Sequence, residues 1–347
     1  MTIRVLIVDD SPTMRAILAA CLSAEPDIQV VGSASNALEG RELMKVHNPD
    51  VVTLDIEMPG MNGLDFLEKI MALRPTPVII VSGSTQQGAE ITARALTLGA
   101  IDCYAKADLD AALQSGSRTK LGDMIRTAAQ VKFERRAPGT PSPAATTAVR
   151  TGSAIRAHRP DIIAIGSSTG GVEALQTMLA SFPADCPPTV IVQHVNPRFA
   201  PAIAKTLDMA SPATVVLAEP DMPLKPGHAY LAPGDDRHLT IGGAPGKFYT
   251  RLRPGNPVSG HLPSVDMLFG SVAQVAGPRA VGALLTGMGS DGARGLLAMA
   301  QAGAHTIAQD EATCTVFGMP RAAISLGAAQ IIAPIGEIAQ YALGKAA

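Results

Sequence analysis

Short apolar runs alternate with stretches of helical periodicity over the first 131 residues. The runs that predict strands lie at 3–8, 28–32, 50–54, 77–81 and 100–104. Helices are expected between them, among them 12–23, which Ser11 caps and Pro12 opens, 39–46, and a last helix over 109–131. Strands that alternate with helices in this way favour a parallel, doubly wound α/β sheet of the flavodoxin-like type.

The same alternation resumes after residue 160. Strands are expected at 162–165, 189–192, 280–286 and 306–308, and helices at 172–180, 200–209, 265–275 and 292–302. Three shorter strands, at 227–232, 238–241 and 249–252, suggest an inserted hairpin. This pattern predicts a second doubly wound, Rossmann-like α/β domain.

Residues 132–160 interrupt both patterns. The segment contains Arg135 and Arg136, continues with three prolines, and then runs through Ala, Thr, Gly and Ser. Such a composition is typical of an extended, flexible and solvated linker, an interpretation we prefer to a nucleic-acid contact. The predicted organisation is therefore a domain at 1–131, a linker at 132–160 and a domain at 161–347.

Composition narrows the class of protein further. The 347 residues include 28 Lys and Arg against 30 Asp and Glu, a net charge of −2, which offers no overall field for nucleic acid or an anionic membrane. No apolar run reaches the length of a membrane span, and the first one stops at Asp9 and Asp10, so neither membrane insertion nor a signal peptide is expected. The four cysteines are widely spaced and form no CxxC pair, which indicates reduced thiols and a cytoplasmic location.

Charged and hydroxyl side chains gather at the predicted strand ends of the first domain. They are Asp9 and Asp10 after the first strand, Asp55 after the third, Ser82 at the end of the fourth and Lys106 past the fifth. The carboxyl ends of parallel strands meet at one sheet edge, so three carboxylates converge there and call for a hard cation such as Mg²⁺. A carboxylate beside Mg²⁺ and a lysine can attack a phosphoryl group. Simple helix capping would explain one aspartate but not the whole set.

These residues carry a family resemblance. The segments Val8-Asp9-Asp10-Ser11 and Leu54-Asp55-Ile56-Glu57-Met58-Pro59-Gly60-Met61-Asn62-Gly63, with Ser82 and Lys106, resemble a two-component response-regulator receiver domain over about residues 1–125. The resemblance implies that Asp55 accepts a phosphoryl group from a histidine kinase. It further implies that Asp10, Asp55 and the Glu57 carbonyl hold Mg²⁺ with Asp9 in support, that Ser82 senses the phosphoryl group, and that Lys106 pairs with it.

Two positions depart from the receiver pattern. The family usually follows the lysine with a proline in a cis peptide bond, whereas Ala107 follows Lys106 here. A cis bond before alanine would cost about 3 kcal/mol, so a different loop is expected. An aromatic switch residue is frequent at the position of Cys103, and here Tyr104 stands beside it.

A candidate nucleophile lies at the start of the second domain. Gly166-x-Ser168-x-Gly170 follows a predicted strand and precedes a helix, which is the spacing of a nucleophile elbow. A turn of this composition could equally bind phosphate or be no more than a tight turn. A partner base is needed to decide.

The position of each histidine relative to the predicted strands indicates which one could act as the base. His194 directly follows the strand at 189–192, and Asp291 follows the strand at 280–286, so both share the sheet edge of Ser168. His305 opens its strand and should lie on the opposite edge. The remaining histidines are interpreted as linker, surface or structural residues, although the segment 261–264 could line the site: His158, His228, His238 and His261.

The triad that results assigns a role to each group. Ser168 attacks a carbonyl, His194 takes and returns its proton, and Asp291 orients the imidazole. The amide of Thr169 is a candidate oxyanion donor, and the turn around Met288 offers a second. No histidine shows metal-ligand spacing, so no cofactor is expected for the hydrolytic step.

The second domain, about residues 160–345, looks like the catalytic domain of the chemotaxis protein-glutamate methylesterase family (CheB). The segments that carry the resemblance lie at 165–171, 192–194, 226–235, 263–266, 286–292 and 308–313. The resemblance implies hydrolysis of glutamate γ-methyl esters on chemoreceptors with release of methanol, deamidation of receptor glutamines, and a role in chemotactic adaptation. Its triad falls on Ser168, His194 and Asp291.

The two resemblances together predict a phosphorylation-activated serine hydrolase in which the unphosphorylated receiver covers the edge that carries Ser168. A second hypothesis remains, a non-catalytic phospho-switch whose glycine-rich crevice binds a partner. A receiver joined to a DNA-binding output is disfavoured, because the second half has no basic helix–turn–helix pattern.

Overall fold

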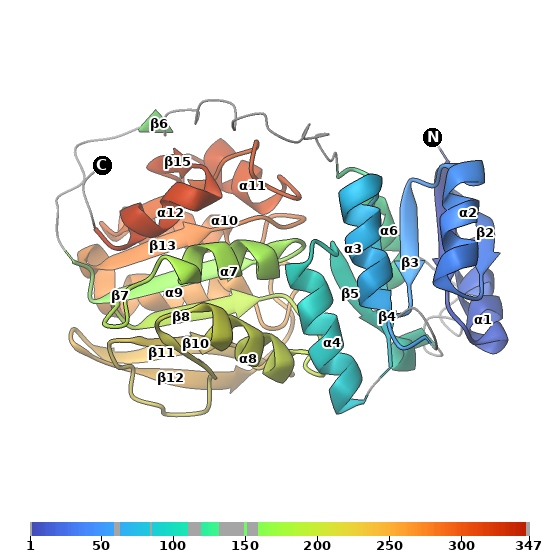
Figure 1. The fold of residues 1–347 in the computed structure, drawn as a ribbon. Helices are drawn as coiled ribbons and strands as arrows, with labels where there is room; N and C mark the ends of the chain where they lie inside the picture. Colours follow the sequence, from blue (N-terminus) through green and yellow to red (C-terminus); the bar gives the residue numbers. More distant parts are fainter. Residues whose placement is uncertain are drawn as a thin grey trace. The chain divides into compact units, whose positions relative to one another are not determined.

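A computed structural model describes residues 2–58, 63–83, 85–109, 119–131, 149–150 and 159–344. The chain divides into two compact units, residues 1–138 and 139–347. Figure 1 shows that each unit is built around its own sheet with helices packed on it. None of the described helices combines the length and apolar character that a membrane span needs.

The first unit is a five-stranded parallel sheet with the order β2-β1-β3-β4-β5. Its strands are β1 (Ile3–Val8), β2 (Ile28–Ala34), β3 (Val51–Leu54), β4 (Val78–Ser82) and β5 (Asp102–Ala105). Its described helices are α1 (Pro12–Ser23), α2 (Ala37–His47), α3 (Gly63–Leu73), α4 (Gln86–Thr97) and α6 (Lys120–Ala128). The predicted doubly wound, flavodoxin-like sheet is confirmed, because strands and helices alternate and β1 lies between β2 and β3.

The first helix of this unit shows how local chemistry sets an element's start. Ser11 is extended (φ −75°, ψ 116°), and its hydroxyl accepts a hydrogen bond from the amide of Met14. Pro12 occupies the first turn, where its missing N–H is not needed. The helix therefore begins directly after Asp9 and Asp10 and holds them at the sheet edge.

The prediction of one helix over 109–131 was wrong. Thr119 is extended (φ −96°, ψ 150°), and α6 begins only after it. The Thr119 amide and hydroxyl both donate to the buried carboxylate of Glu25, at 2.8 and 2.9 Å, while that hydroxyl accepts from the Gly122 amide. This N-cap ends any continuous helix at that point; residues 110–118 lie outside the described part of the chain.

The second unit contains an eight-stranded sheet with the order β6-β15-β14-β13-β7-β8-β10-β9, parallel except for β6. Its strands are β6 (Val149–Arg150), β7 (Ile162–Ser167), β8 (Thr189–Gln193), β9 (Thr214–Leu217), β10 (His228–Leu231), β13 (Ala280–Leu284), β14 (His305–Gln309) and β15 (Ile331–Ala333). Its helices are α7 (Gly171–Ala180), α8 (Ala200–Ala210), α9 (Val265–Ala276), α10 (Ala293–Gln301), α11 (Met319–Ser325) and α12 (Ile335–Ala342). The predicted second α/β domain is confirmed.

A hairpin stands apart from this sheet. Strands β11 (Arg237–Ala244) and β12 (Lys247–Pro254) pair antiparallel as a separate two-stranded sheet, in agreement with the hairpin suggested by the sequence. Buried side chains of the hairpin, Leu239, Ile241 and Phe248, join the core formed by β7, β8 and α9. The hairpin is thereby fixed to the unit that carries the candidate triad.

The expected linker lies mostly outside the described residues. Its residues 149–150 form β6, which pairs with β15 through Arg150 and Ile331 and through Val149 and Ile332. The predicted bounds of the linker, 132–160, stay a prediction.

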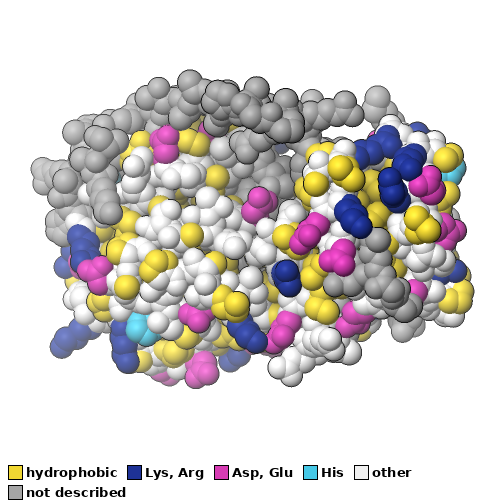
Figure 2. All heavy atoms as spheres, viewed as in Figure 1, with side chains coloured by type: hydrophobic (Ala, Val, Ile, Leu, Met, Phe, Trp, Pro, Cys, Tyr) yellow, Lys and Arg dark blue, Asp and Glu magenta, His cyan; other side chains and the backbone are white. Residues whose placement is uncertain are grey.

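Charged side chains of both signs are interspersed over the face drawn in Figure 2. A group of basic side chains surrounds apolar ones over α2 and α3, where a groove of about 410 Å³ opens. Its lining residues are Ala37, Leu38, Arg41, Met44, Lys45, Phe66, Lys69, Ile70, Leu73 and Arg74. Although the net charge of the chain is close to zero, the surface around this groove is therefore locally basic.

Candidate active site and phosphorylation site

The three carboxylates predicted to converge do so at the carboxyl ends of β1 and β3. Oxygen atoms of Asp9, Asp10 and Asp55 all lie within 4.8 Å of one another, and β1 and β3 are paired neighbours. Asp9 and Asp55 are almost completely buried. Lys106, just past β5, places its Nζ 2.8 Å from Asp9 Oδ2 and 2.7 Å from Asp55 Oδ2.

Burial and charge act against each other in this cluster. Burial raises the pKa of Asp9, and the neighbouring Asp55 adds to that, while the ion pair with Lys106 only partly offsets them. Burial would lower the pKa of Lys106, but its contacts with Asp55 and Asp9 outweigh burial and raise it. Lys106 therefore pairs with two of the three carboxylates, and the remaining negative charge and the oxygen donor set fit an additional hard divalent cation.

Ser82 and Glu57 complete the cluster. The Ser82 hydroxyl is fully buried and has no hydrogen-bond partner among the described residues. Such an orphaned hydroxyl fits a group that arrives later, such as a phosphoryl oxygen. The Glu57 amide donates to Asp55 Oδ1 at 3.1 Å, and its carboxylate accepts from Thr85 Oγ at 2.8 Å. The Glu57 side chain is thus engaged elsewhere, which leaves its carbonyl as the group to consider for a cation.

The two departures from the receiver pattern have visible consequences. Leu262–Pro263 is the cis peptide bond found in the described residues, so the bond between Lys106 and Ala107 is trans. A short 3₁₀ helix, Lys106–Asp108, follows β5 directly. The loop after the lysine thus has no cis bond, as its sequence led us to expect. Tyr104 is buried and donates its hydroxyl to the Asp108 carbonyl at 3.2 Å, and burial raises the pKa of the Cys103 thiol.

In the second unit, Ser168 directly follows β7 and sits in a tightly hydrogen-bonded turn. Its amide donates to the Thr286 carbonyl at 3.0 Å, and its carbonyl accepts from the Gln193 amide group at 2.8 Å. Gly170 follows with φ +73°, a conformation that favours glycine, and caps α7. A strand, a turn with left-handed backbone and a helix give the elbow that the glycine spacing predicted.

His194 lies beside this turn because of strand register. Ser167 and Gln193 are partners across β7 and β8, and the His194 amide donates to the Ser167 carbonyl at 3.0 Å. The Gln193 side chain bridges the carbonyls of Ser168 and His194, at 2.8 and 3.1 Å. The candidate nucleophile and base therefore leave adjacent strands at the same level of the sheet.

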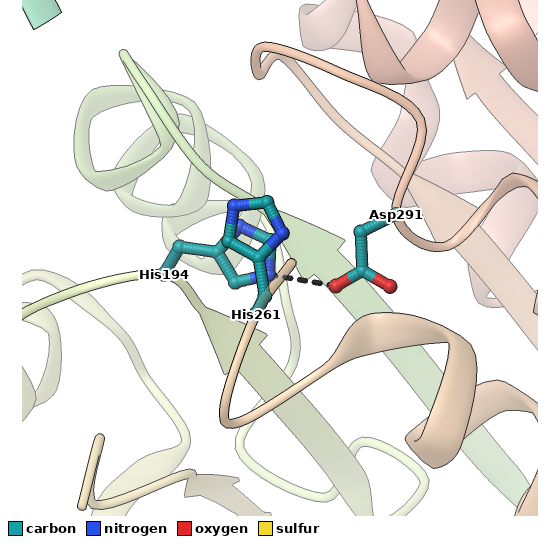
Figure 3. A group of neighbouring side chains, drawn as sticks. All are labelled: His194, His261 and Asp291. Carbon is teal, nitrogen blue, oxygen red and sulfur yellow. Dashed lines mark hydrogen bonds and ion pairs between the residues drawn. The ribbon is translucent and has the colours of Figure 1, made fainter. Parts of the chain in front are cut away.

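Asp291 reaches the same edge from the loop after β13. Its Oδ2 lies 2.8 Å from His194 Nε2, and it is completely buried (Figure 3). The carboxylate also accepts from the Ser264 hydroxyl at 2.7 Å and from the amides of Val265 and Asp266 at 2.8 and 3.0 Å. Those two amides open α9, so the carboxylate sits at a helix N-terminus, where negative charge is stabilised.

These contacts keep Asp291 ionised. Burial alone would raise its pKa, but the hydrogen bond and charge of His194, with those of Asp266 and Ser264, outweigh burial and lower it. A buried carboxylate that stays ionised can hold the His194 ring in one orientation and stabilise its protonated form.

The predicted contact between Ser168 and His194 is not formed in this structure. His194 uses Nε2 for Asp291, and its Nδ1 is buried with no hydrogen-bond partner in the described chain. A hydrogen bond between Ser168 and Nδ1 is therefore absent here. The competing base, His305, opens β14 and pairs with Val281 at the amino end of β13, on the opposite edge from Ser168.

The two candidate oxyanion donors lie next to Ser168. Thr169 follows it directly in the turn, and the Thr169 carbonyl accepts from the Thr286 hydroxyl at 3.0 Å. Met288 follows Gly287, at which an added Cβ would lie 2.7 Å from Ser168 Cβ. Gly287 thus allows the Met288 turn to approach the serine closely.

Sequence reasoning gave one residue of this site no definite role. His261, interpreted as a surface or structural histidine although its segment 261–264 could line the site, stacks on His194 with ring centroids 3.8 Å apart and an interplanar angle of 4° (Figure 3). It lies in a loop without regular secondary structure, so strand-end reasoning had no way to place it. The signal available was its position three residues before Ser264, which binds Asp291.

Known proteins match the chain over nearly its full length. The CheB methylesterase family model matches residues 163–342, and the response regulator receiver domain model matches 5–115. A Caulobacter vibrioides protein named protein-glutamate methylesterase/protein-glutamine glutaminase 1 is 51% identical over 345 residues, which cover 99% of this chain and 98% of that protein. An Agrobacterium fabrum protein of the same kind is 50% identical over 340 residues, covering 98% and 95%.

A solved structure matches the second unit. The catalytic domain of Thermotoga maritima CheB methylesterase is 36% identical and superimposes with a TM-score of 0.51, covering 53% of this chain and 97% of that one. Both sequence resemblances are thereby confirmed. The chain belongs to the CheB methylesterase family and carries a response-regulator receiver domain ahead of its catalytic domain.

Proposed function

We propose that this chain is a serine hydrolase, activated by phosphorylation, that demethylates glutamate γ-methyl esters of chemoreceptors and deamidates receptor glutamines. The observation that carries this proposal is the 2.8 Å hydrogen bond between His194 Nε2 and the buried carboxylate of Asp291, held one strand away from Ser168. A buried carboxylate on one imidazole nitrogen is the arrangement that turns the other nitrogen into a base.

In the first half of the reaction, Ser168 Oγ attacks the carbonyl carbon of the ester and passes its proton to His194 Nδ1. Substrate binding must first bring the Ser168 hydroxyl onto Nδ1, and catalytic hydrogen bonds commonly tighten at that stage. The negative oxygen of the tetrahedral intermediate faces the amides of Thr169 and Met288. When the intermediate collapses, the bond to the methoxy oxygen breaks, and that oxygen takes the proton from Nδ1 and leaves as methanol.

In the second half, water attacks the acyl carbon and gives a proton to Nδ1. The bond to Ser168 Oγ then breaks, the serine regains the proton, and a glutamate side chain is released. A glutamine side chain follows the same steps with ammonia as the leaving group. Asp291 keeps its charge throughout and stabilises the imidazolium that forms twice per turnover.

The first unit supplies control. Asp55 is the proposed phosphoacceptor, a histidine kinase the phosphodonor, and Asp10, Asp55 and the Glu57 carbonyl the groups that would hold Mg²⁺, with Asp9 in support. Mg²⁺ would offset charge on the phosphoryl oxygens during transfer. Lys106, which contacts Asp9 and Asp55 before transfer, and the orphaned Ser82 hydroxyl would bind the phosphoryl group afterwards. Phosphorylation activates only to the extent that it favours one arrangement of the protein over another.

The test measures methanol release from methyl-labelled receptor, with and without a small phosphodonor. The phosphodonor should accelerate methanol release by wild type, and Ser168→Ala should release no methanol. Asp55→Asn should keep the basal rate of release, and the phosphodonor should not change that rate. Undiminished release by Ser168→Ala would refute the serine mechanism. Receptor binding without methanol release by wild type would support the alternative, a non-catalytic phospho-switch.

A further inference from the structure

The imidazole of His261 lies flat against the imidazole of His194. Their centroids are 3.8 Å apart and their planes differ by 4°, and Figure 3 shows the His261 ring directly over the His194 ring, with Asp291 to one side. The pair joins residues 67 positions apart in sequence from two different loops, so this contact depends on the tertiary fold alone.

We propose that His261 is a positioning residue: its ring holds the His194 imidazole in the plane in which Nε2 meets Asp291 and Nδ1 is left available to take a proton. This inference rests on the proposed serine mechanism and adds a component to it. Within the described residues, the His194 ring makes one hydrogen bond, through Nε2. A single hydrogen bond leaves the ring free to tilt about that axis, and a flat neighbour on its face removes this freedom.

The loop that presents His261 is itself closely fixed. Val258 and His261 exchange two backbone hydrogen bonds of 3.0 Å around Ser259 and Gly260. Both of these central residues have positive φ, 52° and 81°, as in a type I′ turn. His261 Nδ1 donates to the Ser259 carbonyl at 3.0 Å, because a carbonyl can only accept. This bond sets both the rotamer and the protonated nitrogen of the His261 ring.

The turn is tied back to Asp291. The Ser259 hydroxyl donates to Asp266 Oδ2 at 2.8 Å, and the Asp266 amide donates to Asp291 Oδ1 at 3.0 Å. Asp266 also accepts from the Gly295 amide at 2.7 Å, which anchors it to α10. A closed circuit therefore runs from His194 through Asp291, Asp266 and Ser259 to His261 and back to His194 by stacking.

A metal site is the competing explanation, since ligand atoms of His194, His261 and Asp291 lie within 4.8 Å of one another. A histidine nitrogen binds a metal along its lone pair, which lies in the ring plane. Two parallel rings whose centroids are 3.8 Å apart direct their lone pairs in separate planes and cannot both point at one ion. Stacking and chelation are thus mutually exclusive for this pair.

The test compares His261→Ala, His261→Leu and His261→Phe in full-length protein, by steady-state methanol release. Loss of the ring in the Ala and Leu variants should lower kcat about 2- to 12-fold, the range to which aromatic stacking energies correspond, with KM within about twofold of wild type. His261→Phe restores a flat ring without a titrating group and should recover most of kcat. Leu fills a similar volume without a flat face, so a difference between Leu and Phe isolates stacking from packing even if the Ala variant is poorly folded.

His228→Ala is the matched control. His228 makes the same kind of local hydrogen bond, from Nδ1 to the carbonyl two residues earlier, at 3.1 Å. Its ring, however, stacks with that of Tyr230 and not with that of His194. The His228→Ala variant should keep wild-type kcat.

A wild-type kcat in both His261→Ala and His261→Leu would overturn the inference. A raised KM with unchanged kcat would also overturn it, because it would mean that His261 contacts the substrate. Zn²⁺ inhibition at equimolar metal, relieved in His261→Ala, would establish the metal site instead. If wild type itself releases no methanol, or Ser168→Ala releases it normally, the proposed function fails first.

Discussion

Four donors converge on the carboxylate of Asp291, and one of them is the imidazole of His194. In Asp291→Asn the charge is lost, and the new amide group must face at least one of these donors. We expect kcat for methanol release to fall by about 10⁴-fold, the size of effect known when an orienting aspartate becomes asparagine. Ser264→Ala removes one donor but keeps the charge, so its kcat should fall far less. Similar kcat values for the two variants would contradict the role given to the charge.

The same substitution carries a prediction about stability. The folded pKa of Asp291 is lowered, so its ionised form stabilises the fold above its unfolded pKa of about 4, and this contribution is lost as pH falls through the folded pKa. Urea unfolding should therefore show a deficit of about 1–3 kcal/mol for Asp291→Asn at pH 7, shrinking below about pH 4. A deficit that is constant with pH would mean that lost packing, and not charge, explains it.

Residue types at strand ends were enough to predict the two clusters, because parallel strands bring their carboxyl ends to one edge. Asp9, Asp55 and Lys106 lie together for that reason, as do His194 and Asp291. Which imidazole nitrogen meets Asp291 could not be predicted, since it depends on side-chain rotamers. The stacking of His261 could not be predicted either, because it depends on the path of a loop that has no periodic pattern.

At the scale of elements, the turn at Gly287 sets how closely the loop after β13 approaches Ser168. A Cβ added there would lie 2.7 Å from Ser168 Cβ and 2.4 Å from Met319 Sδ. Gly287→Ala should therefore destabilise the protein by about 1–3 kcal/mol and lower kcat by displacing the serine turn.

Gly270 provides the control for this substitution. It lies inside α9, and apart from the adjoining residues and the backbone of its own helix no heavy atom would come within 4 Å of a Cβ added there. Gly270→Ala should leave kcat unchanged and raise the free energy of unfolding by about 0.5–1 kcal/mol, since alanine is the better helix former. Thermal and urea unfolding with methanol-release kinetics would test both. A tolerated Gly287→Ala would show that the turn is more adaptable than its contacts suggest.

Elements with long apolar runs were predicted well, whereas two short strands and the start of one capped helix were missed. β9 and β15, with four and three residues, were missed because so short a run carries little periodicity. The helix over 109–131 was drawn through Thr119, although Thr is a frequent N-cap. What decides the matter is Glu25, 94 residues away in sequence, which accepts both hydrogens of Thr119.

At the scale of the whole molecule, the carboxylate cluster of the first unit makes a prediction about metal binding. Calorimetry should detect Mg²⁺ binding to wild type and no binding to Asp10→Asn or Asp55→Asn. Because the pKa of Asp9 is raised, its protonation should weaken Mg²⁺ binding as pH falls through that raised value. Equal affinity in wild type and Asp55→Asn would contradict the assignment of this cluster.

The central claim is that Ser168 is activated by His194, although the two are not hydrogen-bonded in the structure. Labelling with a fluorophosphonate probe, followed by mass spectrometry, tests it most directly, because the probe reacts with an activated serine and needs no receptor. We predict one adduct, on Ser168, whose rate of formation drops at least about 100-fold in His194→Gln. An adduct on another residue, or an equal rate in His194→Gln, would contradict the account.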